Sequence, residues 1–288
     1  MQYLNLSRIN QGVEIIPQTG SIGAEIRGLD LSRPLDGEGF ERLNRAFLDY
    51  QVLFLRGQQL STRQYQDFAL RFGKLAEYLF ADGLEGFPYI TEIVKTEDET
   101  RGFGDFWHSD STYLESPPKI TMLYARQLPP RGGDTLFSNM YAVYDALSPG
   151  LQAALEPLRA VNSASGLPRG ETLYQEVKSR NSERREQFAM HPVIRIHDET
   201  GRKAVYVNGA HSLRFDGMTR DESRPLLNYL FELVARPEFQ FRLGWRTDTL
   251  AIWDNRCTQH YALNDYHGHR RVMHRIIVEG DPPRGPAN

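Results

Sequence analysis

A histidine and a carboxylate two residues apart give the first chemical signal in this sequence. The segment FWHSDSTY places His108 next to Ser109 and Asp110. If the segment is a strand, residues i and i+2 point to the same face, roughly 6–7 Å apart along the chain. An imidazole and a carboxylate on one face suit a metal ion, although the pair alone is also compatible with surface polar residues or a helix N-cap.

A third ligand has to come from elsewhere, and His260 is the best candidate. It lies in WDNRCTQHYA, shortly after the apolar run 249–253. Two histidines and one carboxylate on one face of a metal ion leave three octahedral positions open, which is the facial triad of non-haem Fe(II) oxygenases. We interpret five of the other histidines as structural: His191, His197, His267, His269 and His274.

Two arginines share one face of the last predicted strand. Arg271 and Arg275 alternate with Val272 and His274, so both guanidinium groups point to the same side. Arginine binds a carboxylate bidentately, and two buried arginines need anionic partners. One could hold an acidic cosubstrate and the other an anionic substrate; a solvated face of an edge strand is the alternative.

The elements that must position these residues are mainly strands. Phe40, Leu43 and Phe47 predict a helix, and 52–57 reads as a buried strand. Capping boxes at Ser61 and Thr219 predict two further helices. Further strands are predicted at 192–197, 204–209, 239–246, 249–253 and 272–280. Several short strands with Gly and Pro between them favour a barrel or double-sheet jelly roll with helices packed outside.

Residues 167–187 interrupt this pattern. They are strongly charged and lie between a predicted turn and the strand that starts at residue 192. We expect either a solvated surface segment or a mobile lid over a site.

Composition excludes several functional classes. The 288 residues carry 34 basic and 37 acidic side chains, a formal net charge of −3, so a general nucleic-acid binder is not expected. One cysteine, Cys257, excludes intramolecular disulfides. Because neither a signal peptide nor an apolar run of about 18 residues is visible, we expect a cytoplasmic protein that does not bind membranes.

Taken together, the motifs resemble the taurine dioxygenase family, which includes alkylsulfate and phenoxyalkanoate-herbicide dioxygenases. The resemblance rests on FWHSDSTYLESPPK, RGGDTLF and WDNRCTQHYALNDYHGHRRVMHR in this order, with GAEIRGLDLSRPLD and VLFLRGQ before them. It extends over roughly residues 13–283. A double-stranded β-helix forming a single domain over residues 1–288 is implied.

The resemblance also implies cofactors and residue roles. Fe(II), 2-oxoglutarate and O2 would be used, and His108, Asp110 and His260 match the iron ligands. Thr135 and Arg271 match the residues that hold the 2-oxoglutarate carboxylate. Arg275 matches the arginine that meets the substrate's anionic group, with some contacts to the cosubstrate.

The substrate pocket departs from the taurine-specific members. Where these carry a histidine and an asparagine, this chain has Tyr78 and Gly104, which disfavours a small zwitterion. The Gly-Asp-x-Trp-His run is closer to the herbicide-cleaving members. Ala81, Tyr113 and His211 would complete the pocket.

The implied reaction is hydroxylation of a C–H bond in a small anionic substrate such as a sulfonate, sulfate ester or carboxylate. Succinate and CO2 would be released, and collapse to a carbonyl product could follow. The same chemistry in natural-product biosynthesis, including desaturation, is an alternative. A zinc hydrolase and a non-catalytic jelly-roll binding protein are further alternatives. Relatives are often dimers or tetramers, so a homo-oligomer is expected.

Overall fold

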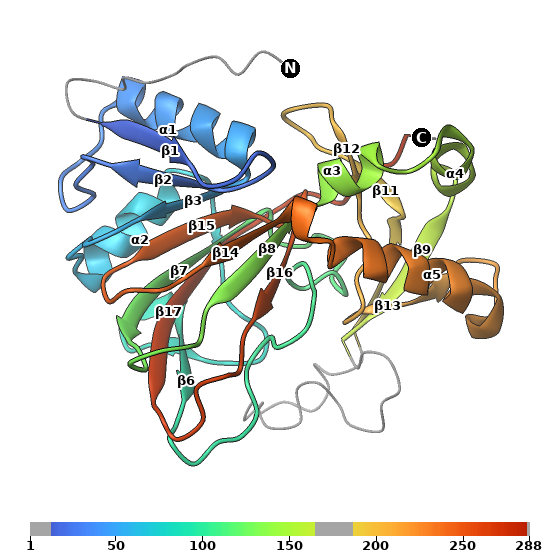
Figure 1. Cartoon of the computed structure of the whole chain (residues 1–288). Helices are drawn as coiled ribbons and strands as arrows, with labels where there is room; N and C mark the ends of the chain where they lie inside the picture. The colour runs from blue at the N-terminus through green and yellow to red at the C-terminus, as the bar shows by residue number, and fades with distance from the viewer. Residues whose placement is uncertain (1–12, 165–186, 287–288) are drawn as a thin grey trace.

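Two β-sheets packed face to face form the body of the protein, and helices cover the outside (Figure 1). The computed structural model describes residues 13–164 and 187–286. The mainly β jelly-roll architecture predicted from the sequence, with flanking helices, is confirmed.

The larger sheet is antiparallel except where β2 runs parallel to β3. Its strands, in spatial order, are β1 (Glu14–Pro17), β2 (Ala24–Arg27), β3 (Val52–Leu55), β15 (Leu250–Asp254), β7 (Ile120–Gln127), β17 (Arg271–Val278), β6 (Phe87–Lys95) and β5 (Gly83–Leu84), with β4 (Leu75–Ala76) also on β17. The smaller sheet has the order β14 (Gln240–Leu243), β8 (Thr135–Asn139) and β16 (Thr258–Ala262).

The central strands of the larger sheet are apolar on both faces because both faces are covered. In β3, Val52 and Phe54 pack in the cluster between the two sheets, together with Phe137 and Phe241 of the smaller sheet. Leu53 and its neighbours of the same parity pack against the helices. Alternating side chains therefore enter two different cores, which explains the unbroken apolar run.

Two of the predicted helices lie on the outer face of the larger sheet. They are α1 (Gly37–Tyr50) and α2 (Thr62–Leu70). Asp36 caps α1, and Ser61 and Gln64 form the predicted capping box of α2. These caps satisfy backbone N–H groups that have no partner within the helix.

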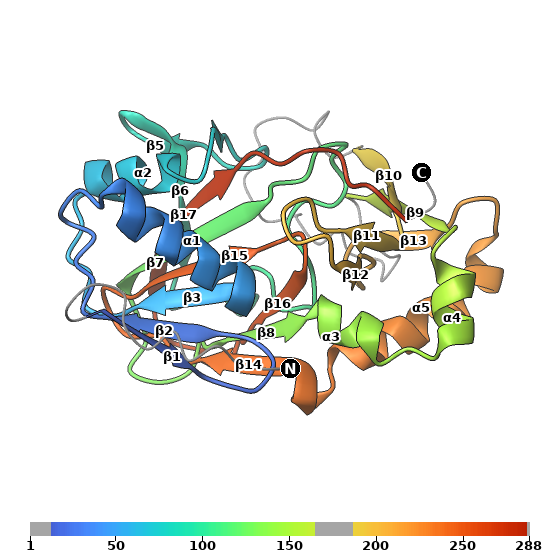
Figure 2. The same cartoon turned by 90° about the horizontal axis from the view of Figure 1, so that it is seen from above.

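A second region flanks the jelly roll on one side (Figure 2). It contains α3 (Met140–Asp145), α4 (Pro149–Leu155), α5 (Arg220–Val234), a 3-10 turn (Pro237–Phe239), a sheet of β10 (Phe188–Pro192), β9 (Arg159–Ser163) and β13 (Ser212–Phe215), and the pair β11 (Ile194–Ile196) and β12 (Lys203–Val205). The capping box predicted at Thr219 opens α5.

Three of the predicted strands depart most from the observed ones. The run 192–197 is divided between the end of β10 and β11, and the run 239–246 contains a strand only at Gln240–Leu243. The run 204–209 leaves the strand after Val205. There Asn208 Oδ1 accepts hydrogen bonds from the backbone of Ala210 and His211, so a side-chain-capped turn replaces strand pairing.

Residues 167–186 of the predicted lid lie outside the described part of the chain. Within residues 13–164 and 187–286, no helix combines the length and apolar character needed to cross a membrane.

Candidate metal and cosubstrate site

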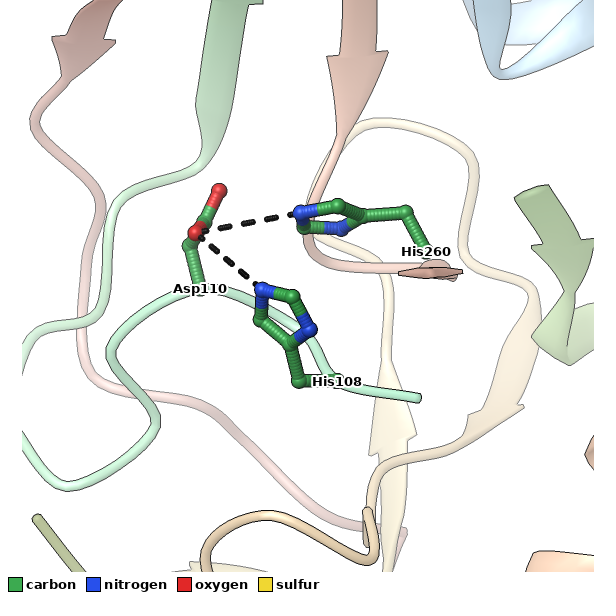
Figure 3. A group of neighbouring side chains, drawn as sticks. All are labelled: His108, Asp110 and His260. Carbon is green, nitrogen blue, oxygen red and sulfur yellow. Dashed lines mark ion pairs between the residues drawn. The ribbon is translucent and has the colours of Figure 1, made fainter. Parts of the chain in front are cut away.

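The three predicted metal ligands meet at one point between the two sheets (Figure 3). His260 lies on β16, and His108 forms an isolated antiparallel bridge to it, with backbone N–O distances of 3.1 and 2.8 Å. Residues 108–110 do not form the continuous strand that was considered for them. After the single bridge, the chain turns at Asp110 and Ser111, and Ser111 has a φ of 49°. Asp110 therefore converges with His108 through a turn.

The ligand atoms of the triad are close enough to share one ion. Nε2 of His108 and Nε2 of His260 lie 3.9 and 4.0 Å from Oδ1 of Asp110. All three ligand atoms lie within 4.8 Å of one another, and all three residues are buried. One oxygen and two nitrogens thus point toward a common centre (Figure 3).

Both histidines are set up as neutral ligands. His108 Nδ1 donates to the carbonyl oxygen of Phe106 at 2.8 Å, which leaves the lone pair on Nε2 toward Asp110. Burial lowers the pKa of His108, against the opposing effect of Asp110. Burial, reinforced by the proximity of His108, holds the pKa of His260 well below its usual value. Neutral imidazoles are the forms that bind metals.

Asp110 is held as a carboxylate by two donors. Arg275 Nη2 donates to Oδ1 at 2.6 Å, and the hydroxyl of Thr121 donates to Oδ2 at 2.6 Å. Burial by itself would raise the pKa of Asp110, but the charge of Arg275 and the hydrogen bond from Thr121 hold this pKa below its ordinary value.

A cavity of about 450 Å³, including its mouth, opens at the triad. Its polar wall includes the three ligands, Thr135, Arg271 and Arg275, and its other walls are mostly apolar: Ile93, Phe103, Gly104, Leu123, Trp253 and Ala262. Gly104 has a φ of +80°, and a Cβ there would lie 3.1 Å from His108 Cε1. A glycine therefore allows close packing of the loop over this imidazole.

Arg271 is buried, and no described residue forms an ion pair with it. Its Nε and Nη2 atoms have no hydrogen-bond partner among the described residues, and burial lowers its pKa. Its guanidinium lies 5.9 Å from the ring of Trp245 and 6.0 Å from the ring of Tyr266. An unpaired buried guanidinium is costly, so a carboxylate ligand fits this position.

Thr135 of β8 lines the same cavity. The indole of Trp245 donates to its Oγ1 at 3.0 Å. Because indole N–H is a donor only, the threonine hydroxyl retains its own hydrogen to donate. Arg271 and Thr135 together offer the donors that a 2-oxoglutarate carboxylate needs.

The shared face of Arg271 and Arg275 is confirmed as a buried face. β17 lies between β7 and β6, so the alternative of a solvated edge strand is wrong. On the other face of the strand, His274 lies 3.4 Å from Glu92, with 13% of its side chain exposed. The sheet therefore directs both arginines into the cavity.

Of the five predicted pocket residues, Gly104 lines the cavity. Tyr78, Ala81 and Tyr113 belong to an adjacent cluster around Phe80. The Arg275 guanidinium lies 4.7 Å above the Tyr78 ring, and burial raises the pKa of Tyr78 to about 12.

His211 lies next to the triad, with its ring 6.4 Å from that of His108. Burial lowers its pKa to about 3, with a further contribution from His108. Its Nδ1 lies 2.9 Å from the Thr112 hydroxyl.

Comparison with known proteins places this geometry in a family. The model of the family described as "Taurine catabolism dioxygenase TauD, TfdA family" matches residues 14–277. The chain belongs to this family. The resemblance recognised in the sequence is therefore confirmed.

Individual relatives are similar in sequence to this protein over nearly its whole length. An alkylsulfatase of Acinetobacter baylyi is 35% identical over 287 residues, covering 96% of this chain and 87% of that protein. A 2,4-dichlorophenoxyacetate dioxygenase of Cupriavidus pinatubonensis, named as alpha-ketoglutarate-dependent, is 34% identical and covers 90% of this chain and 94% of its own length.

Solved structures show the same fold. A taurine dioxygenase from Burkholderia xenovorans has a TM-score of 0.82 with 32% identity, covering 96% of this chain and 93% of that one. The structure of AAD-2 in complex with Mn(II) and N-oxalylglycine has a TM-score of 0.78 with 28% identity, covering 94% and 98%. The chain is thus a non-haem iron dioxygenase that uses Fe(II), 2-oxoglutarate and O2.

Sequence reasoning missed two residues that support the site. Thr121 contacts Asp110, and Trp245 contacts Thr135. The WDNR turn before His260 did give a signal for Asn255, whose Oδ1 accepts from the backbone N–H of Asp110.

Proposed function

We propose that His108, Asp110 and His260 hold Fe(II), that Arg271 and Thr135 hold 2-oxoglutarate, and that Arg275 binds the anionic group of a substrate with an apolar body. The observation that carries this proposal is the pair of arginines on β17. Both line the cavity at the triad, and they differ in their partners: Arg275 is hydrogen-bonded to Asp110, whereas two nitrogens of Arg271 have no partner in the described part of the chain.

The unpaired arginine supports the cosubstrate assignment. A dicarboxylate brings to Arg271 the negative charge that the described residues do not supply. The bidentate fork of a guanidinium matches a carboxylate in geometry as well as in charge. Trp245 contacts Thr135 and lies beside Arg271, so it keeps the two donors together.

Arg275 and the apolar walls support the substrate class. The Arg275 guanidinium lies against the Tyr78 ring, whose neighbours Phe80 and Phe103 are aromatic. An anionic head next to an alkyl or aryl body suits these surroundings better than a zwitterion does, because an ammonium group would be desolvated without a partner. The relatives named as alkylsulfatase and 2,4-dichlorophenoxyacetate dioxygenase are consistent with sulfate esters or phenoxyalkanoates.

When bound, Fe(II) with 2-oxoglutarate and O2 supplies the oxidation: one oxygen atom enters a substrate C–H bond, the other enters succinate, and CO2 leaves. A sulfate ester hydroxylated at the carbon that bears the ester oxygen then collapses to an aldehyde and sulfate. Arg275 holds the anionic group, and so fixes which carbon lies at the triad. Neutral His108 and His260 keep their lone pairs available for the metal.

A matched substrate panel tests this function. Hexyl sulfate, phenoxyacetate, taurine and neutral 1-hexanol are each supplied with Fe(II), 2-oxoglutarate and O2, and succinate is measured together with the aldehyde, sulfate or phenol. We expect equimolar succinate and product from hexyl sulfate or phenoxyacetate, with little from taurine or hexanol. Equal turnover of hexanol and hexyl sulfate would contradict the proposal that Arg275 binds the anionic group of the substrate.

The Arg275→Gln variant separates substrate binding from metal binding. Its KM for the anionic substrate should rise by at least about 10-fold, since a charge-assisted hydrogen bond contributes about 1.5–3 kcal/mol. Mn(II) affinity is measured alongside because Arg275 also contacts Asp110. Arg126→Gln, a change of a half-exposed arginine outside the cavity, is the control.

A further inference from the structure

The side-chain amide of Asn255 can lie in only one orientation. Its Oδ1 accepts from Trp253 Nε1 at 3.1 Å and from the backbone N–H of Asp110 at 3.3 Å. Both groups are donors only, so the oxygen must face them. The Nδ2 group therefore points to Thr121, and it donates to Thr121 Oγ1 at 2.8 Å.

This orientation also fixes the hydroxyl of Thr121. A hydroxyl has one hydrogen, and Thr121 Oγ1 already accepts from Asn255. The hydrogen is donated to Asp110 Oδ2 at 2.6 Å. Trp253, Asn255 and Thr121 thus form a one-way chain of donors that ends on the metal-facing carboxylate.

This series of hydrogen-bond donors is buried along its whole length. Thr121 is 0% exposed, Asn255 1% and Trp253 2%, so water does not compete for these bonds. Hydrogen bonds in such surroundings are stronger than in water, and a lost partner is costly. The members also come from distant parts of the sequence: Thr121 lies on β7, whereas Trp253 lies on β15.

The two oxygens of Asp110 are consequently not equivalent. Oδ2 is occupied by Thr121, while Oδ1 faces the two imidazole Nε2 atoms and accepts from Arg275. We propose that Trp253, Asn255 and Thr121 are positioning residues that hold Asp110 so that Oδ1 is the oxygen presented to the metal. This inference rests on the proposed metal site and adds the residues that orient its carboxylate.

Metal affinity, measured without turnover, tests the donor chain. Thr121→Val removes the hydroxyl at nearly constant shape, and Thr121→Ser keeps it. Calorimetric titration with Mn(II) or Co(II) should show a 10–100-fold weaker affinity for the valine variant, the range typical of residues that support metal ligands. The serine variant should stay within about 3-fold of the wild type, because the donor is retained.

Asn255→Asp examines the direction of the chain independently. The aspartate has the shape of asparagine but no N–H, so it cannot donate to Thr121. It should also weaken metal binding, by an amount similar to that of Thr121→Val. Thr249→Val, which removes another fully buried threonine hydroxyl outside the site, is the matched control and should leave the affinity unchanged.

Thermal unfolding of every variant shows whether the fold is intact. Wild-type affinity in a folded Thr121→Val or Asn255→Asp variant would overturn the proposal, and so would an equal loss in Thr121→Ser and Thr121→Val. If Thr121→Val does not fold, the serine and Asn255→Asp variants decide. If the wild-type protein itself binds no metal, the proposed function fails, which is a different result.

Discussion

Among the described residues, two buried clusters satisfy the same geometric criterion for a metal site. One is the triad of His108, Asp110 and His260, and the other consists of His197, Asp254 and Cys257. In each cluster the ligand atoms lie within 4.8 Å of one another, and every residue is buried. The residue types alone do not separate them.

The second cluster is saturated. Asp254 accepts from Arg256 through Nε at 2.8 Å and Nη2 at 2.7 Å, and from His197 Nε2 at 2.9 Å. His197 Nδ1 accepts from the backbone N–H groups of Glu199 and Thr200, so neither ring nitrogen has a spare lone pair. Burial raises the pKa of the Cys257 thiol well above its usual value. This cluster joins the segment after β11 to the turn after β15.

The triad, by contrast, has capacity left over. His108 and His260 each direct an Nε2 toward Asp110 at distances of 3.9 and 4.0 Å, which are too long for hydrogen bonds. The cavity opens beside them. Nearby Arg271 has two nitrogens without partners among the described residues. Unsatisfied polar atoms next to a cavity, and not the ligand types, mark the functional cluster.

The largest expected effect separates the clusters directly. His108→Ala should abolish Mn(II) binding and turnover, a loss greater than the about 100-fold typical of supporting residues. His197→Ala should keep metal affinity and lower the unfolding temperature instead. Metal titration and thermal unfolding of both variants measure this. If His197→Ala lost the metal and His108→Ala retained it, the distinction between the clusters would be reversed.

A stability measurement tests the saturated cluster. Arg256→Met should lower the free energy of unfolding by about 3–5 kcal/mol at neutral pH, because it leaves the Asp254 carboxylate buried and uncompensated. Burial would raise the pKa of Asp254, but Arg256 holds it below the ordinary value of 3.8. Ionised Asp254 therefore stabilises the fold above pH 3.8, and this stabilisation is lost as the pH falls through the lower folded-state pKa.

Urea unfolding of wild type and Arg256→Met between pH 7 and pH 3 checks both points. The stability difference should shrink at the acid end. A difference that stayed constant or grew below pH 4 would show that Asp254 is not the responsible charge.

The unpaired arginine is tested through cosubstrate binding. Arg271→Gln should raise the dissociation constant of 2-oxoglutarate at least about 30-fold, since truncating one partner of a buried charge pair costs about 2–5 kcal/mol. Mn(II) affinity should change little because Arg271 forms no hydrogen bond or ion pair with the described side chains of His108, Asp110 and His260. Calorimetric titration of the Mn(II)-loaded protein measures the effect, and normal 2-oxoglutarate affinity would contradict the assignment.

The smallest effect concerns the loop over His108. Gly104→Ala should lower the free energy of unfolding by about 1–2 kcal/mol, the cost of a left-handed conformation for a residue with a Cβ. Gly217→Ala is a matched control, because Gly217 has a φ of +74° with no atom within 4 Å of the added Cβ. Only Gly104→Ala should also weaken Mn(II) binding, through contact with His108. Equal metal affinities in the two variants would show that the contact with His108 does not affect metal binding.

Local sequence patterns predicted most of the framework. The periodicity of Phe40, Leu43 and Phe47 and the capping box at Ser61 identified α1 and α2, because these signals involve residues at most one or two turns apart. The alternation of Arg271 and Arg275 predicted a shared face for the same reason. The family motifs supplied the triad and the cosubstrate residues.

The sequence by itself therefore determined the residue types of the site and the secondary structure around them. Only the tertiary structure decided which His-Asp cluster keeps free lone pairs, since Asp254 is saturated by Arg256 and His197. Beside the triad, by contrast, two nitrogens of Arg271 have no partner among the described residues. The tertiary structure also decided that His108 and Asp110 converge through one bridge and a turn, and it brought Thr121 to Asp110. Hydrogen-bond saturation is a property of three-dimensional neighbours, and spacing along the chain carries no record of it.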